Sequence, residues 1–224
     1  MRGFELPIFP LPLVLFPGAP QLLHIFEPRY RQMLADCQAA DRGFGISYVR
    51  AGPADPAPAT GEVGCAVHVQ AVRPLADGRS NLLAVGTARY LLLRFLRTDR
   101  LYRMAFVEPF EDDPPSEDGV HVLAGEVRSL FGDLVRDLGR IDAGAATPPP
   151  LSADPLALSF QVAAALDLDP GIKQRLLSLR ATGRRLRFLR SALRRLRVDV
   201  ERRARAQERA RRNGKPISGV TLGQ

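Results

Sequence analysis

The chain has 224 residues, of which 46% are hydrophobic and 25% charged, as is usual for a globular protein of one large or two small domains. No apolar run approaches the ~20 residues of a membrane-spanning helix. Glu5 and repeated prolines interrupt the apolar core that a signal peptide would need. The composition therefore argues against a transmembrane protein and predicts a cytoplasmic one.

Prolines divide the first apolar segment into three short runs, at residues 6–9, 11–16 and 21–26. Because proline has no backbone N–H, we expect edge strands and turns here, and no central strand throughout. Pro17 and Gly18 predict a turn between the second and third runs.

A helix is expected directly after these runs. Glu27-Pro28 predicts its start, with proline at the first helical position, where the missing donor costs nothing. Apolar side chains follow at helical spacing; they are Tyr30, Met33, Leu34 and Cys37.

This order of signals resembles the start of the Lon protease N-terminal domain, the substrate-binding family. The similar stretches are ELPIFPLPLVLFPG at residues 5–18 and LLHIFEPRYRQML at residues 22–34. The family's later landmarks recur at residues 61–65, 77–79, 85–89 and 107–108, so the resemblance covers at least residues 4–112. It implies a PUA-like, six-stranded, partly open β-barrel in a stand-alone member without ATPase and protease domains.

The residues themselves predict further strands after the first helix. β-forming or alternating stretches lie at 44–50, 62–72, 81–85, 89–95 and 101–107. Asp77-Gly78 predicts a hairpin turn, and Gly86 predicts a bulge or a close backbone approach. We therefore expect an antiparallel set.

An acidic, proline-containing segment at residues 111–119 predicts the domain boundary. Helical periodicity follows at 120–139, 155–166, 169–179 and 181–212, with Asp154 as an N-cap. The predicted fold is α+β: a barrel over 1–112 with one early helix, a four-helix bundle over 119–212, and a flexible tail over 213–224. The stripe from Leu186 to Val200 serves either the bundle core or a dimer interface.

No catalytic constellation is visible in the sequence. A phosphate-binding loop is missing, and neither lysine suits a Ser–Lys dyad. His24, His68 and His121 are isolated, and Cys37 and Cys65 read as buried reduced thiols. We therefore expect no enzyme activity, no metal and no cofactor.

The opening motif supplies the first candidate site. Glu27, Arg29 and Arg31 either set the geometry of the strand–helix corner or contact a bound polypeptide. Apolar residues in the second run form either an exposed patch or a packing layer against the C-terminal helices; the candidates are Leu11, Leu13 and Phe16. The family resemblance implies a non-catalytic module that binds unfolded or flexible polypeptide, as an adaptor to proteolysis.

Charge supplies the alternative function. Residues 1–170 hold 15 basic and 21 acidic side chains, whereas residues 171–224 hold 17 and 3. Such a basic helix is a solvated face, a sequence-independent RNA-binding surface, or a surface for an anionic membrane or an acidic partner helix. The arginines assigned to RNA binding are Arg194, Arg195, Arg202, Arg203 and Arg205.

Overall fold

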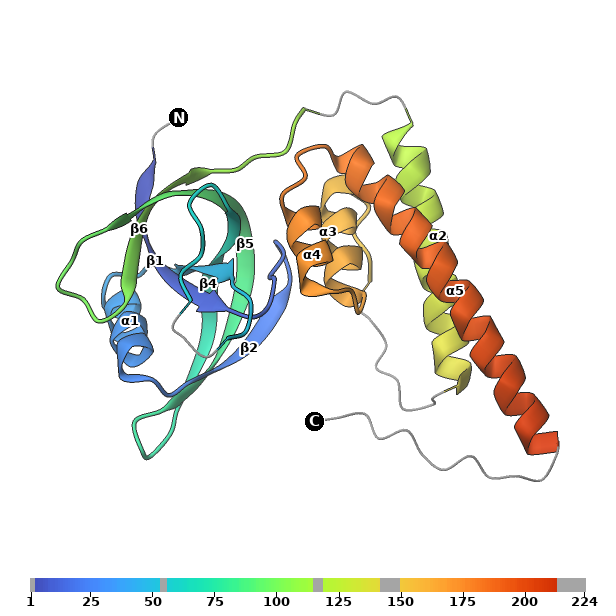
Figure 1. Cartoon of the computed structure of the whole chain (residues 1–224), viewed down its shortest axis with the longest axis horizontal. Helices are drawn as coiled ribbons and strands as arrows, with labels where there is room; N and C mark the ends of the chain where they lie inside the picture. The colour runs from blue at the N-terminus through green and yellow to red at the C-terminus, as the bar shows by residue number, and fades with distance from the viewer. Residues whose placement is uncertain (1–2, 53–55, 115–118, 142–149, 213–224) are drawn as a thin grey trace.

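The computed structural model describes residues 3–52, 56–114, 119–141 and 150–212, and within these it describes all side chains except those of residues 140–141 and 203–212. Figure 1 shows a sheet with a short helix beside it, followed by a helical region. The strands are β1 (Phe4–Leu11), β2 (Pro20–Ile25), β3 (Phe44–Tyr48), β4 (Val63–Pro74), β5 (Ser80–Leu96) and β6 (Arg103–Pro109). The helices are α1 (Pro28–Ala39), α2 (Val120–Ile141), α3 (Pro155–Ala165), α4 (Pro170–Leu177) and α5 (Thr182–Arg212). The predicted tail over 213–224 lies outside the described residues.

The six strands form one mixed sheet whose order, β2-β5-β4-β3-β1-β6, nearly closes into a ring. The long strand β5 makes this possible, because its first part pairs with β2 and β4 and its last part pairs with β6. The pairing of β4 with β5 shifts register between Cys65↔Arg89 and Val67↔Gly86, so β5 holds an extra residue directly after Gly86, as expected for a bulge. The α+β class with one early helix is confirmed.

The expectation of a wholly antiparallel sheet is wrong at one pair. Strands β1 and β3 are parallel, because the chain returns through β2 and helix α1 before entering the sheet beside β1. The proline-containing strand β1 is also not an edge strand. It pairs with β6 up to Ile8 and with β3 from Ile8 onward, so Pro7 and Pro10 each face one paired neighbour.

Helix α1 follows its sequence signals closely. Glu27 is the N-cap residue and Pro28 occupies the first turn. The four apolar residues predicted for its inner face are buried. They pack with Phe9 and Phe44 into the core of the sheet, so α1 covers one end of that core.

The helical region is built on two long helices, α2 and α5, which run side by side in the same direction (Figure 1). Leu186, Leu189 and Leu193 of α5 are fully buried, which assigns the predicted stripe to an intramolecular core. On the flank, Arg190 pairs with Glu126 and Arg197 with Asp133, each at 3.0 Å. The four predicted helices are all present. Within the described residues, none is long and apolar enough to cross a membrane.

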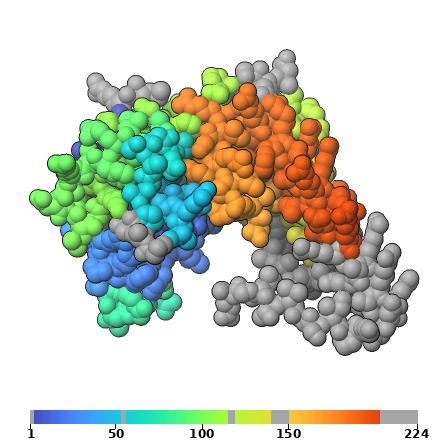
Figure 2. Space-filling model, in the orientation of Figure 1, coloured from blue at the N-terminus to red at the C-terminus, as the bar shows by residue number. Residues whose placement is uncertain are grey.

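The short helices α3 and α4 connect the long pair to the sheet. Asp154 accepts a hydrogen bond from the backbone N–H of Ala157, which confirms it as the N-cap of α3. In α4, the Gln174 side chain donates to the backbone carbonyl of Val63 at 2.8 Å. Figure 2 shows the surfaces of the sheet and of the short helices in direct contact.

A buried arginine pair fastens the helices to the sheet. Arg89 of β5 and Arg185 of α5 bind opposite oxygens of Asp112, at 2.6 and 2.7 Å. The Arg185 guanidinium also stacks on Phe160, 4.0 Å from the ring centroid. Burial lowers the pKa of Arg89 to about 10, against the opposing attraction of Asp112. We call Arg89, Asp112 and Arg185 the arginine clamp.

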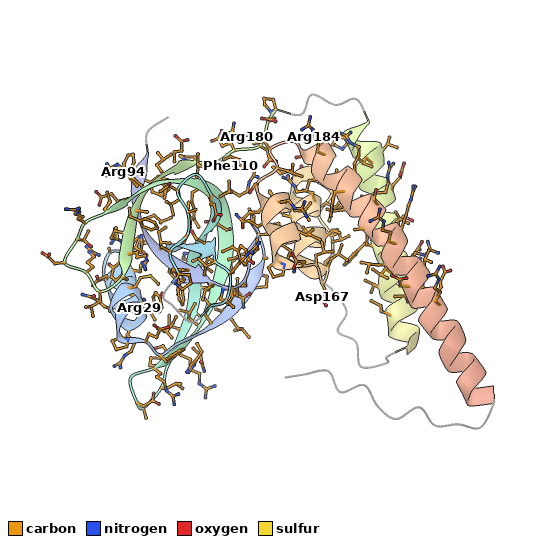
Figure 3. All side chains as sticks on the ribbon, viewed as in Figure 1. Arg29, Arg94, Phe110, Asp167, Arg180 and Arg184 are labelled. Carbon is orange, nitrogen blue, oxygen red and sulfur yellow. The ribbon has the colours of Figure 1, made fainter. Side chains whose placement is uncertain are left out.

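Aromatic contacts extend the clamp toward the surface. Two guanidinium groups lie over the Phe110 ring: that of Arg89 is 4.8 Å from the ring centroid and that of Arg180 is 4.6 Å from it. Figure 3 shows Phe110 and Arg180 together at the junction of the sheet and the helices. In the segment that the sequence marks only as a linker, Asp112 belongs to the arginine clamp and the backbone N–H of Asp113 donates to the Arg180 carbonyl at 3.2 Å. The beginning of that segment therefore packs into the junction.

Candidate functional site

The candidate site lies where β2 leads into α1. Side chains along β2 alternate between solvent and core, because successive residues of a strand point to opposite faces. Leu23 and Ile25 are buried, whereas Leu22 is 75% exposed and Phe26, directly after the strand, is 57% exposed. His24 lies between these two on the same exposed face and stacks beside Phe26, with ring centroids 5.9 Å apart. The result is an exposed row of two large apolar side chains with a histidine between them, which we call the β2 row (Leu22, His24, Phe26).

Strand β2 also presents an unpaired edge. Within the described residues it pairs with β5 alone. His24 is held on the β5 side by a 2.6 Å hydrogen bond to Asn81. Unpaired strand edges with apolar side chains are uncommon on protein surfaces, because they invite another strand to pair. Within the described residues, the outer edge of β2 therefore has no strand partner.

A pocket of about 490 Å³ adjoins the β2 row. Its walls are mainly apolar and come from β1, from the corner before α1, and from the segment after β3. They include Phe9, Leu11, Pro12, Phe26, Tyr30 and Val49. We call it the β2–α1 pocket. Its volume and apolar lining suit one or two apolar side chains.

Charged groups stand at the rim of this pocket. Arg29 contacts Glu27 at 2.7 Å and lies over the Tyr30 ring, 4.7 Å from its centroid; Figure 3 labels Arg29 at the start of α1. The Glu27 carboxylate makes no cap hydrogen bond to the helix. These contacts agree with a geometric role for Glu27 and Arg29, although both residues still line the pocket. Arg50 lies on the opposite wall and is exposed.

The structure brings only part of the predicted peptide-binding set together. Leu11, Glu27 and Arg29 line the pocket. Phe16 is 1% exposed and packs beside Phe160, with ring centroids 6.2 Å apart, so it belongs to the packing layer against the C-terminal helices. Leu13 is half-buried against the sheet core, and Arg31 lies over the turn at Gly78.

Leu22, Phe26 and Val49 are among the contributors that were missed from the sequence. Leu22 and Phe26 stand in the alternating pattern of residues 21–26, which already signals an exposed face once a strand is assumed. Val49 gave no such signal, because its place in the pocket depends on how the segment after β3 returns toward β1.

The basic helix contributes a separate candidate surface. Arg194, Arg195 and Arg202 are all exposed on α5. Arg194 lies 3.9 Å from Glu126, and Arg202 lies 3.9 Å from Asp199. The side chains of the other predicted RNA-binding residues, Arg203 and Arg205, lie outside the described residues.

In the part of the chain that the structure describes, no three His, Cys, Asp or Glu side chains gather in a way that could hold a metal ion. Cys37 and Cys65 are free and buried, as predicted. Burial raises the pKa of both thiols, that of Cys65 to about 12, so neither is an activated nucleophile. All three histidines are exposed.

Comparison with known proteins identifies relatives of this fold. The family described as the ATP-dependent protease La (LON) substrate-binding domain matches residues 5–195. The Lon N-terminal domain protein of Xanthomonas campestris is 25% identical, with a TM-score of 0.60 over 83% of this chain and 96% of that one. The N-terminal domain of a Mycobacterium avium complex Lon protease is 18% identical, with a TM-score of 0.65 over 85% and 98% of the two chains, and shows the same fold.

A curated relative is much longer than this chain. A LON peptidase N-terminal domain and RING finger protein of Schizosaccharomyces pombe is 29% identical over 153 residues. The match covers 62% of this chain and 31% of that protein.

Proposed function

We propose that this chain, which belongs to the family of Lon substrate-binding domains, is a non-catalytic module that captures extended segments of other polypeptides between β2 and α1. The observation that carries the proposal is the exposure of Leu22 and Phe26 beside an apolar pocket, on a strand with an unpaired edge. Large apolar side chains so exposed in a row mark an interaction surface. The matched family supports a role in binding substrate proteins.

Binding by strand addition follows from this arrangement. An extended segment pairs its backbone with the open edge of β2, and its alternate side chains point toward the β2 row and the pocket. Backbone pairing does not depend on the side chains of the bound segment. Selectivity among segments therefore comes from the pocket. Apolar side chains are the favoured occupants, because Phe9, Leu11 and Val49 offer little else.

Affinity for a single segment should be modest. Ordering a disordered chain on a surface cancels much of the contact free energy. Weak and broad recognition suits an adaptor that presents many different chains to a protease, and we extend the proposal to that role. The names of the relatives support it, since they include a Lon protease and a RING finger protein.

Fluorescence anisotropy with a labelled, reduced and alkylated polypeptide tests the proposal. The full chain should bind with micromolar affinity, and Phe26→Ser and Leu22→Ser should each weaken binding about tenfold, the value of burying one large apolar side chain. Leu101→Ser is the matched control, because Leu101 is 63% exposed and lies outside the pocket and the row. The proposal fails if the wild-type chain does not bind, or if the Leu101 variant loses as much affinity as the other two.

A further inference from the structure

The outward face of α5 forms a second surface, independent of the pocket. Its exposed residues recur at alternating spacings of four and three, which places them on one side of a helix. They are Arg184, Phe188, Ser191, Arg195, Val198 and Arg202, and we call them the α5 outer face. Arg187, Arg194, Asp199 and Glu201 of α5 are also exposed, beside this row. This face lies opposite the buried stripe of Leu186, Leu189 and Leu193, so the intramolecular core does not use it.

The arginines of the α5 outer face have fewer acidic partners than the arginines on the flank of α5 that faces α2. On the flank toward α2, Arg190 and Arg197 are neutralised by Glu126 and Asp133. Across the described residues, no ion pair within 4.0 Å involves Arg184 or Arg195, and Arg202 reaches only Asp199, at 3.9 Å. Figure 3 shows Arg184 at the first turn of α5. The face therefore keeps positive charge that the fold does not neutralise.

Two apolar side chains are placed among these cations. Phe188 is 41% exposed and Val198 is 46% exposed. They are ten residues apart, which corresponds to about 15 Å along the helix. The whole face spans about 27 Å, five turns of helix. Phosphate groups offer nothing apolar to Phe188 and Val198, so the mixture fits a protein surface better than a nucleic acid backbone.

We propose that the α5 outer face binds an acidic amphipathic helix of a partner protein. Heptad-like spacing of exposed residues is the pattern on which two helices pack side by side. The partner helix places two apolar side chains about 15 Å apart against Phe188 and Val198. Its carboxylates flank these positions and meet Arg184, Arg195 and Arg202. This surface lies on a different element from the β2 row, so the protein can hold an extended chain and a helical partner together.

A designed peptide serves as the probe. It is a labelled amphipathic helix of about 25 residues, with leucines at the required spacing and glutamates flanking them. A scrambled peptide of the same composition and a 20-base-pair RNA duplex are the comparison ligands. We expect the ordered peptide to bind the full chain in the micromolar range and the scrambled peptide at least tenfold more weakly. Added RNA should not displace it.

Variants of exposed residues locate the site. Arg195→Glu and Phe188→Ser should each weaken peptide binding at least about fivefold. Arg73→Glu, an exposed charge reversal on β4, makes the same change in net charge and should leave affinity within about twofold. Circular dichroism checks that all the variants remain folded.

Four outcomes would overturn the proposal. They are failure of the ordered peptide to bind, equal binding of the scrambled peptide, an equal effect of Arg73→Glu, and displacement by RNA together with no effect of Phe188→Ser. The last result would assign the α5 outer face to nucleic acid. Peptide capture at the β2 row is measured with other variants, so either proposal can fail without the other.

Discussion

Nη2 of Arg185 lies 2.7 Å from Oδ1 of Asp112, which joins the longest helix to the segment that follows the sheet. Arg89 donates from the sheet side to the other carboxylate oxygen. Nη1 of Arg89 donates to the backbone carbonyls of Leu177 and Leu179, and Nη1 of Arg185 donates to that of Leu179. One carboxylate thus compensates two buried cations, and the junction between the sheet and the helices depends on it.

The first prediction concerns this carboxylate. Asp112→Ala leaves two buried guanidinium groups without their counterion, so the free energy of unfolding should fall by about 3–5 kcal/mol. Asp113→Ala is the matched control, because Asp113 is the adjacent exposed carboxylate, and it should change stability by less than about 0.5 kcal/mol. Urea titration followed by circular dichroism measures both. Equal effects of the two substitutions would contradict the role given to Asp112.

The second prediction contrasts two phenylalanines of the opening motif. Phe16 is buried between the sheet and α3, and Phe16→Ala should cost about 3–5 kcal/mol of unfolding free energy. Phe26 projects from the β2 row, so Phe26→Ser should change stability by less than about 0.5 kcal/mol while it weakens peptide binding. Thermal unfolding of both variants is the measurement. A large loss of stability in the Phe26 variant would show that this ring packs in the fold and is not free to bind.

The third prediction is a loss of stability at alkaline pH. Burial raises the pKa of Cys65 to about 12 and also raises the pKa values of Cys37 and Tyr90. The folded chain thus keeps protons that the unfolded chain releases above pH ~9. The stability from Cys65 is fully present below that pH and is lost as the pH rises toward 12, by up to about 1.4 kcal/mol per pH unit.

Urea unfolding at several pH values between 8 and 10.5 tests this slope. Cys65→Ala should make the dependence shallower, whatever it does to stability at pH 8. An identical slope in the variant and the wild-type chain would mean that the Cys65 thiol ionises as readily in the folded state as in the unfolded one.

The fourth prediction concerns glycine. A Cβ atom at Gly86 would lie 2.3 Å from the backbone oxygen of Phe16 and 3.0 Å from Sγ of Cys65, so Gly86→Ala should destabilise the chain by more than about 2 kcal/mol. Gly125 of α2 has open space around it, and Gly125→Ala should stabilise by about 0.5–1 kcal/mol because alanine favours helix. Thermal melts of the two variants should therefore shift in opposite directions.

Local signals predicted much of the secondary structure. The start of α1 at Pro28, its four buried residues and the Asp154 cap were all readable, because each depends on neighbours within one or two helical turns. Gly86 was recognised as a special position in the same way. Its close approach to the oxygen of Phe16 was not, because that oxygen belongs to a loop about seventy residues earlier.

The amino-acid order by itself determined where most helices and strands form, which residues of α1 and of the α5 stripe face inward, and which family the chain resembles, since periodicity, capping and proline placement act over short distances. Only the tertiary structure decided that β1 runs parallel to β3 and changes partners at Ile8. It also decided that Phe16 is buried while Phe26 is exposed, and that Asp112 holds Arg89 and Arg185. These outcomes depend on contacts between residues far apart in the chain, and packing selects such contacts only when all the elements come together.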